Sequence, residues 1–331
     1  MQLRATMIAR LFYSQLPEWA RPTHPMMRYS IGYRPLQRRQ AILRTILGVV
    51  LAVLIIGISY AYTAGSTEAP APTYREFMYY PLVAASLLMQ LLALALTVNS
   101  VALERQKGTW DSLQITLVGA QTSIRARWIL VFYRLRWVLL VIFVLRLGYL
   151  GFLMQDLTDF EGRAIDVRII GISPEVSLEV AVFLIAALMT AAVLQPFVAL
   201  AFDAAVGVLL ATITRRRNVG ILTTVVLLMG RILLTTGALW FGNDIVNASG
   251  STIAITEMRS IEAWGRVLLL ATQGDLSLRL LNLETLGNLW ADLSNGIYLG
   301  GIVLVLVILQ AIVANAMVLF AAWRAARPAR N

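Results

Sequence analysis

The sequence predicts an all-α, polytopic membrane protein with six transmembrane helices, on three observations. Hydrophobic residues make up 59% of the 331 residues and charged residues only 14%, which is more apolar than an ordinary soluble domain. Long apolar runs recur along the chain, and the run 302–323 contains no charge over a length that crosses about 30 Å of hydrocarbon. The basic residues gather in alternate connections between these runs, as they do in membrane proteins.

We place the six spans from the apolar runs and their flanking charges. They are 41–62, 79–102, 129–153, 178–213, 219–241 and 297–323, which together form a transmembrane domain over 41–323. The fourth span is long for one crossing and contains Pro196, so two short spans are the alternative. No charge and no Gly–Asn turn lies between Leu194 and Ala199. This favours one tilted or kinked helix.

The distribution of basic residues predicts the orientation. Six spans place both termini on one side of the membrane. On that side, 20 of the 28 lysines and arginines lie in 1–44, 104–136, 215–217 and 324–331, whereas the opposite loops hold six. The arginine-rich side is therefore expected to be cytoplasmic. The net charge of +10 then reflects topology rather than a nucleic-acid partner, and the chain is expected to be a multi-pass protein of the cell inner membrane.

Three segments lie outside the spans. Residues 1–40 are expected to be a cytoplasmic basic segment, either an interfacial helix on the lipid of the inner leaflet or a disordered tail. Residues 324–331 are expected to be a cytoplasmic basic tail. The external loop 242–296 includes the apolar stretch 267–286, which Gly274, Asp275 and Arg279 interrupt. This stretch is too broken to span, so it is predicted to form re-entrant or interfacial helices.

The residue types exclude several kinds of chemistry. The chain has no cysteine and one histidine, His24, which excludes disulfides, thiolate metal sites and clustered-histidine zinc sites. Its one lysine, Lys107, is not part of a G-x-x-x-x-G-K-[ST] loop that would hold phosphates. We therefore expect no catalytic residue, no metal ligand and no cofactor in this chain, and no enzyme activity of its own.

A group of charges follows the second span. Glu104, Arg105, Lys107 and Asp111 surround the pair Gly108–Thr109 in the sequence ERQKGTWDSL. The glycine can take the left-handed conformation that ends a helix, and the threonine is a good N-cap for the next one. The aspartate then falls in the first turn of the new helix, where it complements the helix dipole.

The new helix is expected to be short and amphipathic. Trp110, Leu113 and Leu117 are three and four residues apart, so they share one helix face. Such a helix, lying along the membrane, suits docking into a groove of a soluble partner. The alternative is a solvated basic loop that only orients the second span.

These residues resemble a known signature. The run Glu104 to Leu113, followed by Thr116, is similar to the E-[RK]-x-x-G-T-x-[DE]-x-L-x-x-T signature of ABC-2 type transporter permeases. The sequence GVLLATITRRR at 207–217 is similar to the end of that family's fourth span. The chain departs from the family at Leu117, where proline is common, and it lacks a clear Gly–Lys step into the third span.

The resemblance implies a fold and a function. The fold would be an ABC-2, type V exporter-like transmembrane domain, and the loop 103–128 would hold the coupling helix. The chain would be the permease of an exporter, with a second permease subunit, identical or different, and a separate ABC ATPase that binds ATP and magnesium. The residues implied in ATPase coupling are Glu104, Arg105, Lys107, Gly108, Thr109, Trp110, Asp111, Leu113 and Thr116. Two other classes stay open: an ATP-independent secondary transporter or channel, and a noncatalytic membrane anchor or assembly protein.

Charged residues within the spans are expensive unless they are paired or hydrated. Asp203 in span four lies 13 residues before Arg216, and Arg231 in span five lies 15 residues after it. At about 1.5 Å per residue their depths agree within about 3 Å. We therefore predict an intramembrane ion pair between Asp203 and Arg231, which either lines a polar path or locks two helices. Arg146 in span three is predicted to reach outward or to meet an acid such as Asp156 or Glu179.

Overall fold

The structure, a computed structural model, describes residues 17–21, 24, 25, 27, 74–106, 108, 110, 119–158, 177–214, 217–247, 259–272, 278, 280, 281, 286, 289, 290, 293 and 295–326. All regular structure within these residues is helical, with no strand. The predicted first span at 41–62, most of 1–40 and residues 327–331 lie outside the described residues.

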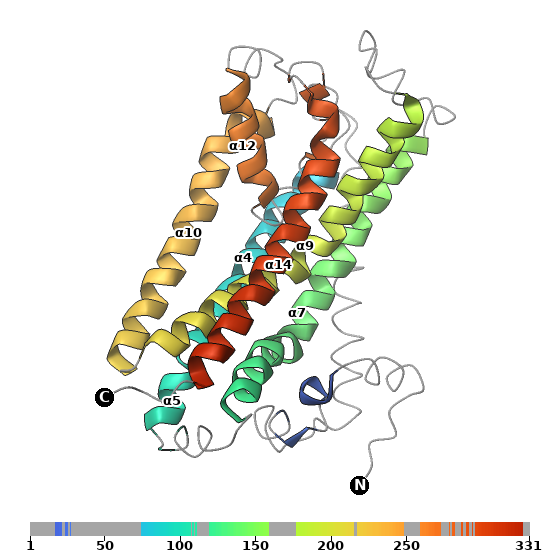
Figure 1. Cartoon of the computed structure of the whole chain (residues 1–331). Coiled ribbons are helices and arrows are strands. Elements are labelled where there is room, and N and C mark those ends of the chain that lie inside the picture. Colours follow the sequence, from blue (N-terminus) through green and yellow to red (C-terminus); the bar gives the residue numbers. More distant parts are fainter. Residues whose placement is uncertain are drawn as a thin grey trace.

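Five long helices form the described part of the fold. They are α4 (Tyr74–Val98), α7 (Gly119–Thr158), α9 (Leu178–Ile213), α10 (Arg217–Asn247) and α14 (Leu299–Ala326). Shorter elements are η1 (Glu18–Ala20), α5 (Ser100–Gln106), α12 (Ser260–Thr272) and η4 (Gly296–Tyr298). Figure 1 shows the long helices gathered as a bundle, with α10 at its edge. We call the end of the bundle that carries α5 and the beginning of α7 the loop end.

Five stretches are long and apolar enough to cross a membrane. They are Met78–Gln106, Gly119–Gln155, Glu179–Ile213, Asn218–Gly242 and Gly296–Ala326. Each overlaps one of the last five predicted spans. Helix α7 begins ten residues earlier than the predicted start at residue 129, because its first turns continue toward the loop. Large apolar side chains remain exposed on α10 and α14, as hydrocarbon surroundings permit. The chain is therefore consistent with a multi-pass membrane protein.

Helix α9 lies at the centre of the bundle. It contacts α4, α7 and α14, and its contact with α14 is the most extensive between two described helices. It continues without interruption through Pro196, so the prediction of one helix rather than a hairpin is confirmed. Its 36 residues correspond to about 54 Å of helix. Helix α10 instead packs on α4 and on α12.

Gly300 explains how α14 comes so close to α9. A Cβ atom at this position would collide with the carbonyl oxygen of Leu184 and lie 3.2 Å from the Cβ of Leu188. Small residues at membrane helix interfaces allow backbones to approach in this way. At the neighbouring Gly301, a Cβ atom would make only an ordinary contact, 3.5 Å from Cδ2 of Leu184.

Gly300→Ala is expected to destabilise the bundle by about 1–3 kcal/mol, because α14 must move away from α9 to make room for the methyl group. Gly301→Ala adds the same methyl group to the same helix without the collision and is the matched control. The melting temperatures of the two purified variants in detergent measure the effect. Equal melting temperatures would contradict the assigned close approach.

The segment after α10 contains one described α-helix longer than two turns, α12. The stretch 267–286 was expected to form re-entrant or interfacial helices, whereas the described helix α12 begins at Ser260 and ends at Thr272. Glu262 and Arg266 form an ion pair one turn apart near its start. Its buried residues, Ala263, Val267, Leu270 and Ala271, recur at helical spacing and pack in the main core.

Candidate functional site

The chain turns at Gly108 at the loop end. Helix α5 ends at Gln106, and the N–H of Gly108 donates to the carbonyl oxygen of Arg105 at 3.1 Å. Gly108 has φ +70°, the left-handed conformation that the sequence led us to expect there. The predicted coupling residues Lys107, Thr109, Asp111, Leu113 and Thr116 lie outside the described residues.

Trp110 is an internal contact of the bundle. Its side chain is 2% exposed and belongs to a buried group drawn from four helices. The other members are Val101 of α5, Ala120 and Ile124 of α7, Val208 and Ala211 of α9, and Ala321, Ala322 and Ala325 of α14. The prediction that this indole forms part of an exposed docking ridge is therefore wrong. The alanines of α14 leave room for the indole of Trp110 to pack inward.

Two arginines lie against the Trp110 ring. The guanidinium carbon of Arg105 is 5.7 Å from the ring centroid and that of Arg127 is 5.4 Å from it. Arg127 comes from α7, and it also forms an ion pair with Glu104 of α5. A cation over an indole contributes about 0.5–2 kcal/mol, more when water is excluded. We call Glu104, Arg105, Gly108, Trp110 and Arg127 the loop cluster.

Arg127 is the member of the loop cluster that sequence reasoning missed. In the sequence it counts as one of several basic residues that orient the chain. The structure buries it to 6% exposure, between Ala126 and the half-buried Trp128. Arg125 lies two residues before it, so the sequence does not distinguish Arg127 as the arginine that needs a buried counter-charge.

Glu104→Gln is expected to lower stability by about 1–3 kcal/mol, because it leaves the buried guanidinium of Arg127 without its counter-charge. The matched control is Glu262→Gln, which removes an ion pair whose carboxylate is 53% exposed. The control should change stability by less than about 0.5 kcal/mol. Thermal unfolding of both variants in detergent gives the comparison. A decrease in melting temperature in the control as large as that in Glu104→Gln would contradict the assignment of a buried ion pair between Glu104 and Arg127.

A second polar group lies within the spanning helices. Nη2 of Arg231 on α10 is 3.6 Å from Oδ2 of Asp203 on α9. The same guanidinium donates from Nε and Nη2 to Oε1 of Gln90 on α4, at 3.0 and 2.8 Å. We call Gln90, Asp203 and Arg231 the polar triad. The two charged members are the residues that matched in depth along the sequence, and both side chains are largely buried.

Gln90 was not identified from the sequence. It is neutral, so it does not stand out against a hydropathy profile as a charge does. The signal that could have identified it is a buried amide in an apolar run, which must find a hydrogen-bond partner away from water. Through Gln90 the triad joins α4 to α10, two helices that are in direct contact.

Arg146 lies elsewhere than predicted. It is on α7, its side chain is 0% exposed, and its Nη1 donates to the carbonyl oxygen of Ala192 on α9. The expectation that it reaches outward is therefore wrong. Glu179, one of the acids considered as its partner, is exposed at the first turn of α9. The physical reason is that Pro196 leaves a carbonyl of α9 in need of a donor.

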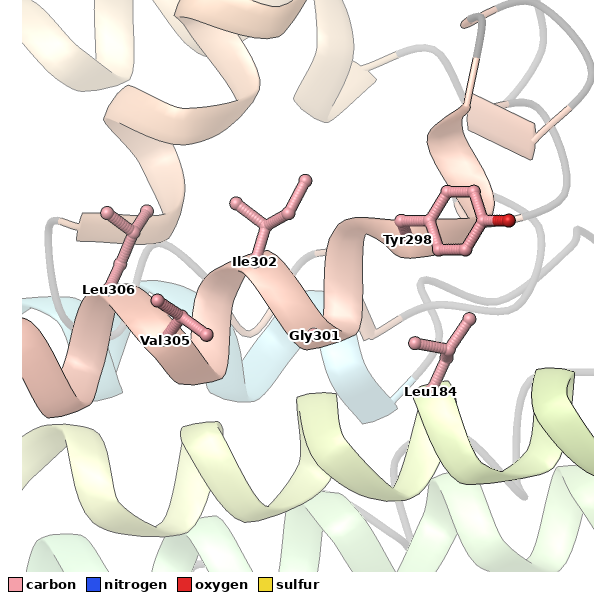
Figure 2. Close-up of a pocket in the computed structure, with 6 residues that line it drawn as sticks. All are labelled: Leu184, Tyr298, Gly301, Ile302, Val305 and Leu306. Atoms are coloured by element: carbon pink, nitrogen blue, oxygen red, sulfur yellow. The ribbon is translucent and has the colours of Figure 1, made fainter.

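An apolar groove lies between α9 and α14 at the end of the bundle opposite the loop end. Figure 2 shows Leu184 of α9 facing residues of α14 and the adjoining η4. The groove has a volume of about 360 Å³ and is lined by Leu184, Tyr298, Gly301, Ile302, Val305 and Leu306. This lining suits hydrocarbon and offers no carboxylate, imidazole or amine for acid–base chemistry.

The described residues contain no group of three or more His, Cys, Asp or Glu side chains that could hold a metal ion. The described residues form two polar groups, the loop cluster at one end of the bundle and the polar triad within the spans. Comparison of the chain with protein-family models, curated proteins and solved structures gives no match. The two groups are accordingly interpreted from their own residues.

Proposed function

We propose that this chain is the membrane-spanning permease subunit of an ATP-driven ABC transporter, and that the transporter is an exporter. A separate ATPase subunit would bind ATP and magnesium and would contact the chain at the loop end. A second permease subunit, identical or different, would complete the pathway. The loop end would face the cytoplasm, as the distribution of arginines favours.

The observation that carries the proposal is the loop cluster. Trp110 joins the loop to α5, α7, α9 and α14 through one buried group, and the Glu104–Arg127 ion pair crosses from α5 to α7. A force applied to the loop would therefore reach four helices at once. The resemblance of ERQKGTWDSL to the ABC-2 signature supports an ATPase as the source of that force.

The buried Trp110 changes the expected mechanism. Its side chain cannot be the surface that a partner grips, since it is 2% exposed. Gln106 and Gly108 are the exposed described residues beside it, so a partner would touch the loop there and the indole would pass the movement inward. ATP state and cavity state would then be coupled, each altering the equilibrium of the other.

The polar triad favours a second candidate, an ATP-independent secondary transporter. Charged side chains between spanning helices often mark ion or proton pathways. In such a transporter, the ion pair between Asp203 and Arg231 would break and re-form as the coupling ion passes. The two candidates differ in their energy source, which is directly measurable.

The test uses the full chain purified in mild detergent from its own membranes and reconstituted in liposomes. The proposal predicts that an ATPase co-purifies and that vanadate-sensitive ATP hydrolysis depends on the chain. Liposomes that hold the chain alone should show no transport in response to a proton or sodium gradient. Gradient-driven transport without ATP would instead support the secondary transporter. The absence of both ATP hydrolysis and gradient-driven transport would support an anchor or assembly role and would overturn the proposal.

A further inference from the structure

Pro196 leaves a gap in the hydrogen bonds of α9. Proline has no backbone N–H, so the carbonyl four residues earlier in a helix loses its donor. In α9 that carbonyl belongs to Ala192. The structure brings Nη1 of Arg146 on α7 to this oxygen, and the arginine side chain is completely buried. A charged donor thus occupies the place of the missing N–H.

The two halves of α9 on either side of Pro196 lie toward opposite ends of the bundle, and both pack on α14. In the half before the proline, the carbonyl of Leu184 lies against Gly300 of α14. The half after it carries Asp203 of the polar triad and two members of the buried group around Trp110. Movement at the loop end can reach the opposite end through α9 only if the turn at Pro196 holds its angle.

Two further hydrogen bonds hold α9 near Pro196. Gln195, next to the proline, is 1% exposed and its Nε2 lies 3.4 Å from the carbonyl oxygen of Thr272 at the end of α12. Trp128 of α7 donates its indole N–H to the carbonyl oxygen of Ala201, 2.9 Å away, in the half that follows. Helix α7 therefore holds α9 on both sides of Pro196, by Arg146 and by Trp128.

We propose that Arg146 is a positioning residue that closes the break at Pro196 and keeps the two halves of α9 at one fixed angle. A hydrogen bond from a charged donor is roughly twice as strong as a neutral one, so the guanidinium replaces a backbone N–H effectively. Without it, α9 bends over a range of angles at the proline. The role of Arg146 in fixing the angle of α9 does not depend on an ATPase. The consequence of that role for transport rests on the proposed function.

Pro196→Ala gives a specific way to test the assignment. Alanine restores an N–H at position 196, and the carbonyl of Ala192 then has a donor within its own helix. Removing the Arg146 side chain should therefore change the angle between the two halves of α9 when Pro196 is present, and should change it much less in the Pro196→Ala variant. Such dependence of one substitution on another reports a direct interaction between the two sites.

The measurement is the distance between two spin labels on α9. The chain has no cysteine, so Phe183→Cys and Ile213→Cys can be labelled alone. Both side chains are exposed, and the labels span the proline over about 45 Å of helix. We expect one narrow distance distribution for the natural turn and a broader one, shifted to shorter distances, for Arg146→Gln. Arg146→Lys should recover part of the narrow distribution, because it keeps a charged donor.

The deciding variant is Arg146→Gln with Pro196→Ala, which should return to a narrow distribution. If Arg146→Gln alone does not fold, recovery of folded protein by Pro196→Ala supports the proposal in the same way. Arg136→Gln, at an exposed arginine on the same helix, is the control and should leave the distance unchanged. An unchanged distance distribution for Arg146→Gln would overturn the proposal. Equal broadening, or an equal loss of folded protein, with and without Pro196→Ala would also overturn it. None of these results depends on whether an ATPase is found.

Discussion

Trp110→Ala is expected to abolish ATP hydrolysis that depends on this chain while leaving the chain inserted in the membrane. Truncating a buried tryptophan costs about 3–5 kcal/mol, and here the lost contacts join the loop to four helices. The two arginines beside the ring would also lose its face. Movement of the loop that follows α5 should then no longer be transmitted to the helices of the bundle. Vanadate-sensitive ATP hydrolysis and protease cleavage of the loop, measured on the same preparation, report coupling and loop order separately.

Trp240→Ala is the matched control for this prediction. Trp240 is on α10 and is 73% exposed, so its truncation removes an indole without opening a cavity. Trp110→Phe should retain part of the activity, since phenylalanine keeps an aromatic face for the arginines. Normal ATP hydrolysis in Trp110→Ala would show that the buried group does not transmit movement from the loop.

Asp203→Asn is expected to reduce the yield of folded protein strongly, and Arg231→Gln is expected to restore part of it. Removing the carboxylate leaves the guanidinium of Arg231 between spanning helices without its counter-charge, which costs about 3–5 kcal/mol for a buried pair. In the double variant no charge remains, and Gln90 can hydrogen-bond to the new amide. Fluorescence-detected size-exclusion chromatography of detergent extracts measures the folded fraction.

Thr224→Val supplies the control for the polar triad. It removes an uncharged hydrogen bond, from Nδ2 of Asn99 to Oγ1 of Thr224 at 3.1 Å, at another contact of α10. Such bonds within membranes contribute roughly 0.6 kcal/mol, so the loss of yield should be small. Additive losses from Asp203→Asn and Arg231→Gln would contradict a direct interaction between the two charged side chains.

Much of the fold follows from the sequence because long apolar runs have few alternatives in a membrane. A run that begins near Gly296 and ends near Ala326 can bury its backbone polar groups only as a helix. Asp203 and Arg231 could be placed at matching depths from the sequence, since the rise per residue of a helix is constant. The fourth span was predicted as one helix because nothing around Pro196 could make a turn.

The missed features concern which neighbour a side chain meets. Spacing assigns Trp110 an apolar face, but whether that face packs inward or against a partner depends on the alanines of α14, two hundred residues later in the chain. Arg146 and Ala192 were both visible in the sequence, and Pro196 marks the carbonyl that lacks a donor. Only the packing of α7 against α9 connects them. Gln90 was missed for the same reason, because its partner lies on α10.

The central claim is that an ATPase grips this chain at the loop end, and site-specific photo-crosslinking tests it most directly. A photoreactive amino acid replaces exposed Gln106 beside the loop cluster, or exposed Ile261 on α12 at the opposite end of the bundle as the control. Irradiation of native membranes, followed by mass spectrometry of the adducts, identifies what each position touches. We predict an adduct with a protein that contains a G-x-x-x-x-G-K-[ST] nucleotide-binding loop from Gln106 and none from Ile261. Lipid adducts alone at Gln106, or the same ATPase captured at both positions, would contradict the account.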